Sequence, residues 1–286
     1  MKNEVAAVVI LYNPNDSVYE NIESYKDQVD ILLIYDNSEV KNLALIGRLI
    51  NCSKVVYIDN KSNRGIAEVL NMAAEKAINL GYKFLLTMDQ DSKAPRDLIR
   101  KLIGKFKESD KVSIVSPLHS NKFNTHLKSN KNIEEKVMSV MTSGNLLSLN
   151  AYQVIGPFLE DFFIDYVDIE YCIRANFLNY QVIRINDIVL LHNEANLTNK
   201  KILSRVYYPS NNFPTRFYYK TRNLLYLRSI YKKKFSYPLK MEYDAYLRNV
   251  VKMLLFEKEK VKKTRMILFG ILDYVRGIKG KKFLND

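Results

Sequence analysis

Two aspartates stand one residue apart in Asp89-Gln90-Asp91, directly after the apolar run FLLTM. Side chains two positions apart on an extended chain point to the same side, so both carboxylates can face one point. Such oxygens suit Mg²⁺ or Mn²⁺, and a metal held there would neutralise a departing diphosphate. The alternative is a polar turn at a strand end, in which Ser92 and Asp97 open the next helix. Spacing alone does not choose between the two.

Two further polar clusters also follow apolar runs. Asp36, in IYDNS, can accept a hydrogen bond from a nucleotide base, or it can form an Asx-turn or a helix N-cap. Asn63-Arg64-Gly65 opens a helical pattern. Gly65 permits close backbone approach, and a helix N-terminus beside Arg64 suits an anion. A plain cap formed by Asn63 is the alternative.

The segment FFIDYVDIEYCIR places Asp165, Asp168 and Glu170 within six residues, followed by Arg174. Helical spacing puts Asp165 and Asp168 on one face, with Arg174 offset from them. A carboxylate kept among these aromatic side chains would serve as a general base. An acidic first turn of an amphipathic helix is the alternative reading of the same pattern.

The remaining titratable candidates are few. His192 follows the strand-like run 182–191, although a lone histidine is more often structural than a metal ligand. His119 and His126 lie in or beside a polar stretch and have no assigned role. Cys52 and Cys172 are far apart in the sequence, so we expect both to be small buried residues in a reducing compartment.

The elements that must position these residues are short apolar runs separated by helical patterns. The pattern 65–80 predicts a helix that ends at Gly81. The order predicts an α/β fold with an open, doubly wound, mostly parallel sheet covered by helices on both faces. Ligands bind beyond the carboxyl ends of such strands, so the polar residues should line one crevice. The predicted strands are 5–11, 31–35, 54–58, 84–88 and 112–115.

The second half of the chain changes in composition. Residues 123–136 are polar and predict a mobile loop, and helices are predicted at 215–231, 240–256 and 262–275. We expect a catalytic domain over 1–200, with its nucleotide-binding half at 1–120. The expected helical extension covers residues 201–286.

Charge is concentrated in that extension. The 286 residues carry a net charge of +13, and residues 200–286 hold 22 Lys and Arg against 6 Asp and Glu. A basic tail can meet nucleic acid, an anionic membrane surface or phosphate-bearing substrates. No apolar stretch approaches the roughly 18 residues of a spanning helix, and the apolar start is poorly flanked for a secretory signal. We therefore expect a cytoplasmic protein.

Several motifs resemble, in order and spacing, the family 2 glycosyltransferases of the GT-A fold, and among them the bacterial rhamnosyltransferases. The likeness covers residues 5–223. It also implies Mg²⁺ or Mn²⁺ as cofactor. Its pieces are VVILYNP, IYDNS, NRGIAEVLN, TMDQDS, TSGNLLS, FFIDYVDIEYCIRA and LLHN.

The resemblance implies roles for the donor-side residues. Asp36 would bind the N3–H of a uracil or thymine ring. Asp89 and Asp91 match the metal motif, with Asp91 the more direct ligand, and His192 would complete the metal shell. Asp89 is also a nucleotide-binding candidate, and the others are Tyr12, Asn13, Asn63 and Arg64.

The resemblance also implies a catalytic base. Asp168 takes the place of the family's base, but the Glu that precedes it there is Val167 here, so the motif is incomplete. Asp165 is a second candidate, and the assignment between the two stays open. Glu170 and Arg174 are expected to support the base. Thr142-Ser143-Gly144 would lie beside the donor sugar and acceptor.

The implied reaction is inverting transfer of L-rhamnose from dTDP-rhamnose to a lipid-linked or polysaccharide acceptor. A polyprenyl-diphosphate-linked sugar at the inner face of the cell membrane is the expected acceptor. The basic tail would then rest on anionic lipid, and neutralising Lys232 to Lys234 should lower liposome binding. A solvated surface and an oligomer contact are alternatives for the tail.

Alternative functions remain at this point. Within the family, the donor could be another UDP- or dTDP-sugar, such as galactose, galactofuranose or glucose. A non-catalytic sugar-nucleotide-binding protein of the same fold would bind dTDP without turnover. A nucleic-acid-binding protein would explain the basic tail, but the strand-end carboxylates would repel phosphate, so no nucleic-acid partner is expected.

Overall fold

The computed structural model describes residues 4–121, 123, 133–192, 198–202, 205–233 and 236–282. They form two compact units, one of Met1–Leu159 with Asp168–Asn193 and one of Glu160–Val167 with Glu194–Asp286. The second unit thus includes the eight-residue segment Glu160–Val167, which lies in the sequence between the two stretches of the first unit. The predicted functional boundary at residue 200 stays a prediction. His126 and most of the predicted mobile loop lie outside the described residues.

The first unit is built on one mixed sheet of order β3-β2-β1-β4-β8-β6-β9-β5, with β7 paired to β9. Its strands are β1 (Val5–Leu11), β2 (Ile31–Asp36), β3 (Val55–Asp59), β4 (Phe84–Asp89), β5 (Ser92–Lys93), β6 (Val112–Ser120), β7 (Glu134–Lys136), β8 (Asn145–Ser148) and β9 (Gln181–His192). Its helices are α1 (Ser17–Glu23), α2 (Leu43–Leu49), α3 (Ile66–Asn79), α4 (Leu98–Ile103), α5 (Leu149–Ile155) and α6 (Val167–Phe177), with short 3₁₀ turns η1 (Lys26–Gln28) and η2 (Gly104–Lys107).

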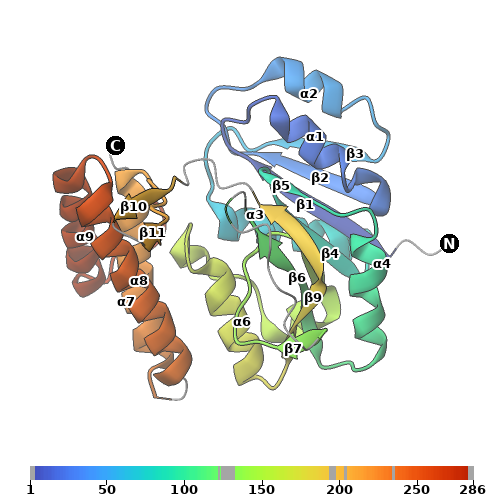
Figure 1. Cartoon of the computed structure of the whole chain (residues 1–286). Coiled ribbons are helices and arrows are strands. Elements are labelled where there is room, and N and C mark those ends of the chain that lie inside the picture. The colour runs from blue at the N-terminus through green and yellow to red at the C-terminus, as the bar shows by residue number, and fades with distance from the viewer. Residues whose placement is uncertain are drawn as a thin grey trace. The chain divides into compact units, whose positions relative to one another are not determined.

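The N-terminal half of the sheet is parallel, as the sequence predicted (Figure 1). β1 lies between β2 and β4, with Leu11 opposite Asp36 and Ile10 opposite Asp89. β3 follows on the far side of β2, with Asp36 opposite Asp59. This register brings the carboxyl ends of four strands to one edge, where the predicted site residues begin.

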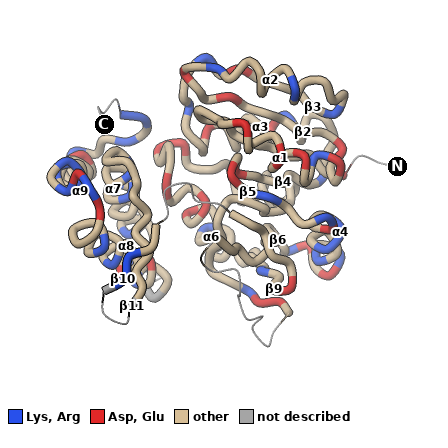
Figure 2. Tube along the Cα trace, turned by 45° about the horizontal axis from the view of Figure 1, so that its top comes forward, with Lys and Arg blue, Asp and Glu red and all other residues tan. Residues whose placement is uncertain are grey.

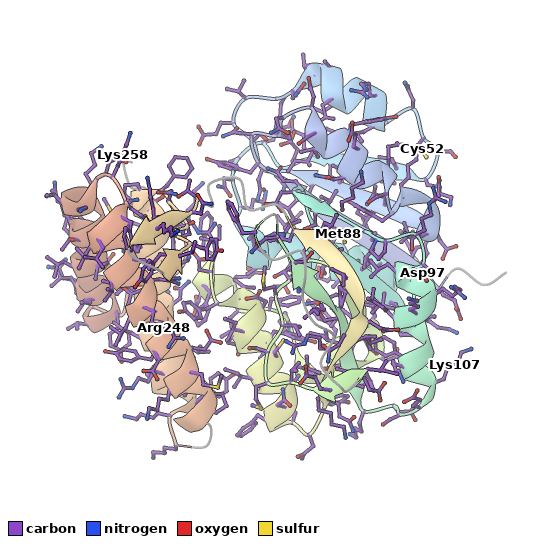
Figure 3. The ribbon with its side chains drawn as sticks, viewed as in Figure 1. Cys52, Met88, Asp97, Lys107, Arg248 and Lys258 are labelled. Carbon is purple, nitrogen blue, oxygen red and sulfur yellow. The ribbon has the colours of Figure 1, made fainter. Side chains whose placement is uncertain are left out.

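Helices cover both faces of the sheet because side chains of a strand alternate between the faces. On β1, Val5, Ala7, Val9 and Leu11 belong to one core cluster that includes residues of α1, α2 and α4. α3 contacts β1 and β4, and α5 contacts β6 and β8. Met88 of β4, labelled in Figure 3, belongs to the first cluster and is almost fully buried just before Asp89.

The long helix α3 has the predicted ends within one residue. It is flanked by Gly65 and closed by Gly81, which adopts φ +80° and whose N–H donates to the carbonyl of Ile78. A left-handed glycine at this position is a common helix terminator. At its other end, α3 begins beside the end of β2, where Asn37 Nδ2 donates to the carbonyl of Gly65.

The other half of the sheet differs from the prediction. β8 is antiparallel to both β4 and β6, although the sequence pattern predicts no strand at 145–148. β6 continues to Ser120, whereas we expected it to end before Pro117. The pairing of β6 with β9 shifts register between Pro117 and Leu118. A bulge there accommodates a residue that has no N–H to donate to the ladder.

The second unit is helical, with a small hairpin of β10 (Lys200–Ile202) and β11 (Arg205–Tyr207). It contains η3 (Glu160–Phe162), α7 (Pro214–Tyr231), α8 (Ser236–Phe256) and α9 (Lys260–Val275), so the three predicted helices are confirmed. Phe217, Tyr218, Met253 and Met266 form part of its core. Figure 2 shows Lys and Arg at several positions along α8 and α9. No helix among the described residues is both long and apolar enough to span a bilayer.

The two cysteines have different surroundings. Cys172, on α6, is fully buried, and burial raises the pKa of its thiol. Cys52 is only partly buried, which corrects the expectation that both would be buried. It follows α2 in the turn before β3.

Candidate functional site

Three potential metal ligands meet at the carboxyl end of β4. Ligand atoms of Asp89, Asp91 and His192 all lie within 4.8 Å of one another. Asp89 ends β4, while β5 begins directly after Asp91 and pairs antiparallel with the end of β9, with Ser92 opposite His192. This pairing brings a histidine about one hundred positions away in the sequence to the two aspartates.

A chain of hydrogen bonds fixes this cluster. The backbone N–H of Asp89 donates to Ser143 Oγ at 3.1 Å, and Ser143 Oγ donates to Ser92 Oγ at 2.8 Å. Ser92 Oγ lies 2.7 Å from His192 Nδ1, which is also 3.3 Å from Asp91 Oδ1. Ser92 and Ser143 are fully buried, so the imidazole is held in one orientation. Partners of this kind orient metal-binding histidines.

The donor set of this cluster fits a divalent cation. Two carboxylates supply hard oxygen ligands, and an imidazole nitrogen is acceptable to most transition-metal dications. Asp89 and Asp91 are both partly exposed, so a ligand's own oxygens can reach the same point.

Gln90, the residue between the two aspartates, ties this turn to β1. Its Oε1 accepts from the N–H of Tyr12 at 2.9 Å, and its Nε2 donates to the carbonyl of Tyr12 at 3.1 Å. Asn21 of α1 donates to the carbonyl of Gln90 at 2.9 Å. The paired amide contact holds Tyr12 and Asn13, both exposed, beside the acidic turn.

Asp36 is buried, with no exposed surface. Its Oδ1 accepts from the N–H of Ser38 and its Oδ2 from the Tyr57 hydroxyl, each at 2.8 Å. Lys41 Nζ lies 3.5 Å from Asp36 and 3.0 Å from Asp59 of β3. Hydrogen bonds from Lys61 and then Lys41 hold the pKa of Asp59 below its usual value. The role of Asp36 in binding a nucleotide base stays a prediction.

The loop before α3 is tied to the end of β2. Asn37 Oδ1 accepts from the Arg64 N–H at 3.3 Å, and its Nδ2 donates to the Gly65 carbonyl at 3.1 Å. Asn63 Oδ1 accepts from the Gly65 N–H at 2.9 Å. The exposed Arg64 side chain pairs with Glu68 one turn along α3. The predicted nucleotide residues at the end of β2 and before α3 are therefore connected through hydrogen-bonded loops.

Asp168 stands in the first turn of α6 and turns toward the segment before β8. Its Oδ2 accepts from the Thr142 N–H at 2.9 Å and from Thr142 Oγ1 at 3.2 Å, and its Oδ1 accepts from the Ile169 N–H. Burial raises the pKa of Asp168, against the opposing effect of these hydrogen bonds. A carboxyl with a raised pKa accepts a proton more readily than an exposed one.

The predicted companions of Asp168 lie elsewhere. Asp165 has φ +63° and precedes α6, so the two aspartates do not share a helix face as we expected. Both Asp165 oxygens accept from Arg216, at 2.6 and 2.7 Å. Glu170 is buried and paired with Arg174, which also donates to the carbonyls of Ile155, the last residue of α5, and of Pro157 in the turn after it. This pair anchors α6 to that turn.

The backbone at Gly144 is closely packed between the acidic cluster and Asp168. Gly144 adopts φ +77°, and a Cβ there would lie 2.9 Å from side-chain atoms of both Leu190 and Pro117. Its N–H donates to the carbonyl of Thr87 at 2.7 Å. Only glycine combines this dihedral with this space. The Thr142-Ser143-Gly144 turn is thereby held against β4 and β9.

His119 is an additional site histidine for which the sequence indicated no role. Its Nε2 lies 2.6 Å from the carbonyl oxygen of Ser143, and since a carbonyl only accepts, that nitrogen carries the proton. Burial lowers the pKa of His119 to about 4, so the ring is neutral near pH 7. It lies edge-on to His192 at 6.4 Å between ring centroids. Its position in β6 was hidden because Pro117 suggested that the strand ended earlier.

The family model "Glycosyl transferase family 2" matches residues 6–183, which is more than half of the chain. The chain belongs to glycosyl transferase family 2. The match includes Asp36, Asp89, Asp91 and Asp168 and ends before His192.

Individual relatives agree with family 2. The chain is 26% identical to dTDP-rhamnosyl transferase RfbF of Shigella flexneri, over 98% of each chain. The crystal structure of S. aureus TarS 1-349 in complex with UDP-GlcNAc is similar, with a TM-score of 0.56 at 13% identity, over 96% of this chain and 81% of that one.

Another solved structure, GalNAc-T7 with UDP, GalNAc and Mn²⁺, has a TM-score of 0.56 at 11% identity. The match covers 67% of this chain and 44% of that one. These structural likenesses show the fold, which is the expected GT-A fold of a family 2 glycosyltransferase with a C-terminal helical extension.

Proposed function

We propose that this family 2 transferase moves L-rhamnose from dTDP-rhamnose to a glycan acceptor with the help of Mg²⁺ or Mn²⁺. The observation that carries the proposal is the convergence of Asp89, Asp91 and His192 at the carboxyl end of β4. A cation bound by these three side chains would neutralise the diphosphate of the departing nucleotide. The Mn²⁺ and UDP of GalNAc-T7 support a metal and a nucleotide-sugar donor.

Asp168 is the proposed general base. Hydrogen bonds from Thr142, from the Ile169 N–H and from its own backbone N–H hold the Asp168 carboxylate in place. Asp168 is only partly buried, so an acceptor hydroxyl can approach it. Asp165 has both oxygens engaged by Arg216, so it is less suited to accept a proton. These contacts favour Asp168 in the assignment that the sequence left open.

The proposed step is a direct displacement. Asp168 takes the proton of the acceptor hydroxyl while the oxygen of that hydroxyl forms a bond to the anomeric carbon of the donor sugar. The bond from that carbon to the diphosphate oxygen breaks, and dTDP leaves with the electron pair. The configuration at the anomeric carbon is inverted because the attack comes from the face opposite the leaving group. Ser143 and Gly144, which are both buried, would support the wall of the proposed sugar site from beneath.

The choice of rhamnose rests on the relative RfbF, a dTDP-rhamnosyl transferase similar over nearly the full chain. The UDP-GlcNAc of TarS makes another nucleotide sugar the alternative donor. We therefore expect metal-dependent transfer with dTDP-rhamnose in a panel that also contains UDP-galactose, UDP-galactofuranose, UDP-glucose and UDP-GlcNAc. Product formation on a polyprenyl-diphosphate-linked acceptor is measured with Mn²⁺ and with EDTA. Equal rates in EDTA, or faster transfer from a UDP-sugar, would contradict the metal or the rhamnose assignment respectively.

We also propose that α9 rests on an anionic lipid surface at the inner face of the cell membrane, where the lipid-linked acceptor would be found. Val261, Leu268, Leu272 and Val275 are exposed and recur at helical spacing along one face. Lys258, which precedes α9, is exposed and labelled in Figure 3, as is Arg248 of α8. An apolar stripe on a helix of a strongly basic extension suits anionic lipid rather than a second copy of a basic chain.

The double substitution Leu268→Asp with Val275→Asp should lower binding to vesicles that contain anionic lipid at least tenfold, since it puts charge into the stripe. Vesicle sedimentation measures the effect, and Val40→Asp, at an exposed site in the first unit, is the matched control. Unchanged binding would contradict the proposal, and a dimer dissociated by the substitutions would assign the stripe to a second copy. Lys234, part of the predicted basic run, lies outside the described residues.

A further inference from the structure

The segment 160–167, which leads into Asp168, has an unusual backbone. After the short turn η3, Phe163, Asp165 and Tyr166 have φ values of +62°, +63° and +64°. Large side chains rarely adopt this left-handed region because Cβ then crowds the carbonyl oxygen. Such conformations persist only where the surroundings enforce them, and they gather at functional sites. The segment therefore needs an external restraint.

Asn223, on α7, supplies part of that restraint. Its Nδ2 lies 2.8 Å from the carbonyl oxygens of Phe162 and Ile164 and 3.0 Å from that of Asp165, so its two N–H groups are shared among three acceptors. Asn223 is fully buried, and one amide group thus satisfies three carbonyls of a segment that lacks regular secondary structure. The contacts span the residues with left-handed backbone.

Arg222, the neighbour of Asn223, orients this amide. Its Nε donates to Asn223 Oδ1 at 3.1 Å, which turns the amide nitrogen toward the segment. Its other nitrogens donate to the carbonyl of Asp161 at 3.1 Å and of Gly280 at 2.8 Å. Arg222 is fully buried and lies against Tyr218, with its guanidinium carbon 5.2 Å from the ring centroid. Because the buried Arg222 guanidinium donates to backbone carbonyls and forms no ion pair with any described residue, we infer that it stabilises the conformation of this backbone.

Arg216, at the start of α7, holds the segment by its side chain. Its guanidinium forms the two-pronged pair with Asp165, with Nε and Nη2 at 2.7 and 2.6 Å from the two oxygens. The planar fork fixes direction as well as distance. The Asp165 side chain is 8% exposed and that of Arg216 is 38% exposed, so this pair can be altered without opening the core.

We propose that Arg216, Arg222 and Asn223 of α7 are positioning residues that hold segment 160–167 in its partly left-handed conformation and thereby fix the position of Asp168 in the first turn of α6. Asp168 is three residues from Asp165 along the chain, so any relaxation at Phe163–Tyr166 moves its carboxylate relative to Thr142. The helical extension would then take part in the transfer step. This inference rests on the proposed function of Asp168.

The first test is Arg216→Gln, which removes the fork but keeps a polar side chain. We expect kcat to fall about 100-fold, the loss typical of a reacting group misplaced by about 1 Å. The KM for the nucleotide sugar and the affinity for dTDP should stay within about twofold, since the donor-side residues are untouched. Arg216→Lys should recover part of kcat because it retains charge without the fork. The charge exchange Asp165→Arg with Arg216→Asp should recover more than either single change.

Arg228→Gln is the matched control, because Arg228 lies exposed on the same helix and the same charge is lost. Its kcat should equal that of the wild type. Hydrogen exchange gives a readout independent of activity: Arg216→Gln should accelerate exchange at 160–168 and leave α8 and α9 unchanged. Unchanged exchange, or an unchanged kcat, would overturn the inference. A wild type that transfers no sugar, or Asp168→Asn with full activity, would instead overturn the proposed function.

Discussion

Replacing Asp168 by Asn is expected to lower kcat by about 10²–10⁴-fold, the contribution typical of a positioned general base. Asparagine has nearly the same shape and can still accept from Thr142, but it cannot take a proton. Affinity for dTDP with Mn²⁺ should stay within about twofold because Asp168 is separate from the acidic cluster. Initial rates with saturating donor measure the first effect, and calorimetric titration measures the second.

The raised pKa of Asp168 fixes how this activity depends on pH. A base works only when ionised, so kcat should fall as pH drops through a value above the usual 3.9 or so of an aspartate. The pKa of Asp168 is higher in the folded state than in the unfolded state. The stabilisation that protonation gives the folded state is therefore fully present at pH below the unfolded-state pKa, and it is lost as pH rises through the folded-state pKa. Asp168→Asn should therefore gain stability relative to the wild type toward neutral pH.

Thermal unfolding at pH 4 and pH 7 tests this sign, and exposed Asp110→Asn is the matched control. Asp110→Asn should leave both rate and stability near those of the wild type. A variant Asp168→Asn that transfers at the wild-type rate would show that another group accepts the proton. A variant that has lost dTDP affinity would show that Asp168 acts on the donor instead.

Strands with continuous apolar runs were predicted well, because a strand buried on both faces of the sheet needs apolar side chains at nearly every position. The run 5–11 coincides with β1, and the helix expected at 65–80 differs from α3 by one residue at each end. β8, at Asn145–Ser148, was missed because a four-residue strand paired on both sides has no periodicity of its own. The end of β6 was predicted too early because of Pro117, which has no N–H to donate. A bulge at this position lets the strand continue past the proline.

The site was predictable where its residues are neighbours in the sequence. The metal-binding role of Asp89 and Asp91 was predicted from their spacing, whereas that of His192 was predicted from resemblance. His192 reaches the two aspartates only through the pairing of β5 with β9, which the sequence does not indicate. Ser92 and His119 were given no site role, since hydrogen bonds across the sheet cannot be inferred from composition. The restraint by Arg216 and Asn223 was also missed, because Asp165 was expected on the same helix face as Asp168.

Asp91→Ala is expected to lower kcat/KM roughly 1,000-fold, since the charge stabilisation that a metal gives a departing diphosphate is worth several kcal/mol. The affinity for dTDP in Mn²⁺ should fall about 100-fold, while in EDTA the variant and the wild type should bind dTDP equally weakly. This equality separates loss of a metal ligand from loss of a direct nucleotide contact. His192→Ala should show the same pattern more mildly, because two carboxylates still face the cation.

Asp187→Ala is the matched control for Asp91→Ala, because Asp187 is exposed on β9, the strand that carries His192, and lies outside the acidic cluster. Its affinity for dTDP in Mn²⁺ should equal that of the wild type. If Asp91→Ala weakened dTDP binding equally in EDTA and in Mn²⁺, the carboxylate would act on the nucleotide without a metal. The convergence of Asp89, Asp91 and His192 would then be a structural network stabilised by Ser92 and Ser143, and the proposed chemistry would lose its cation.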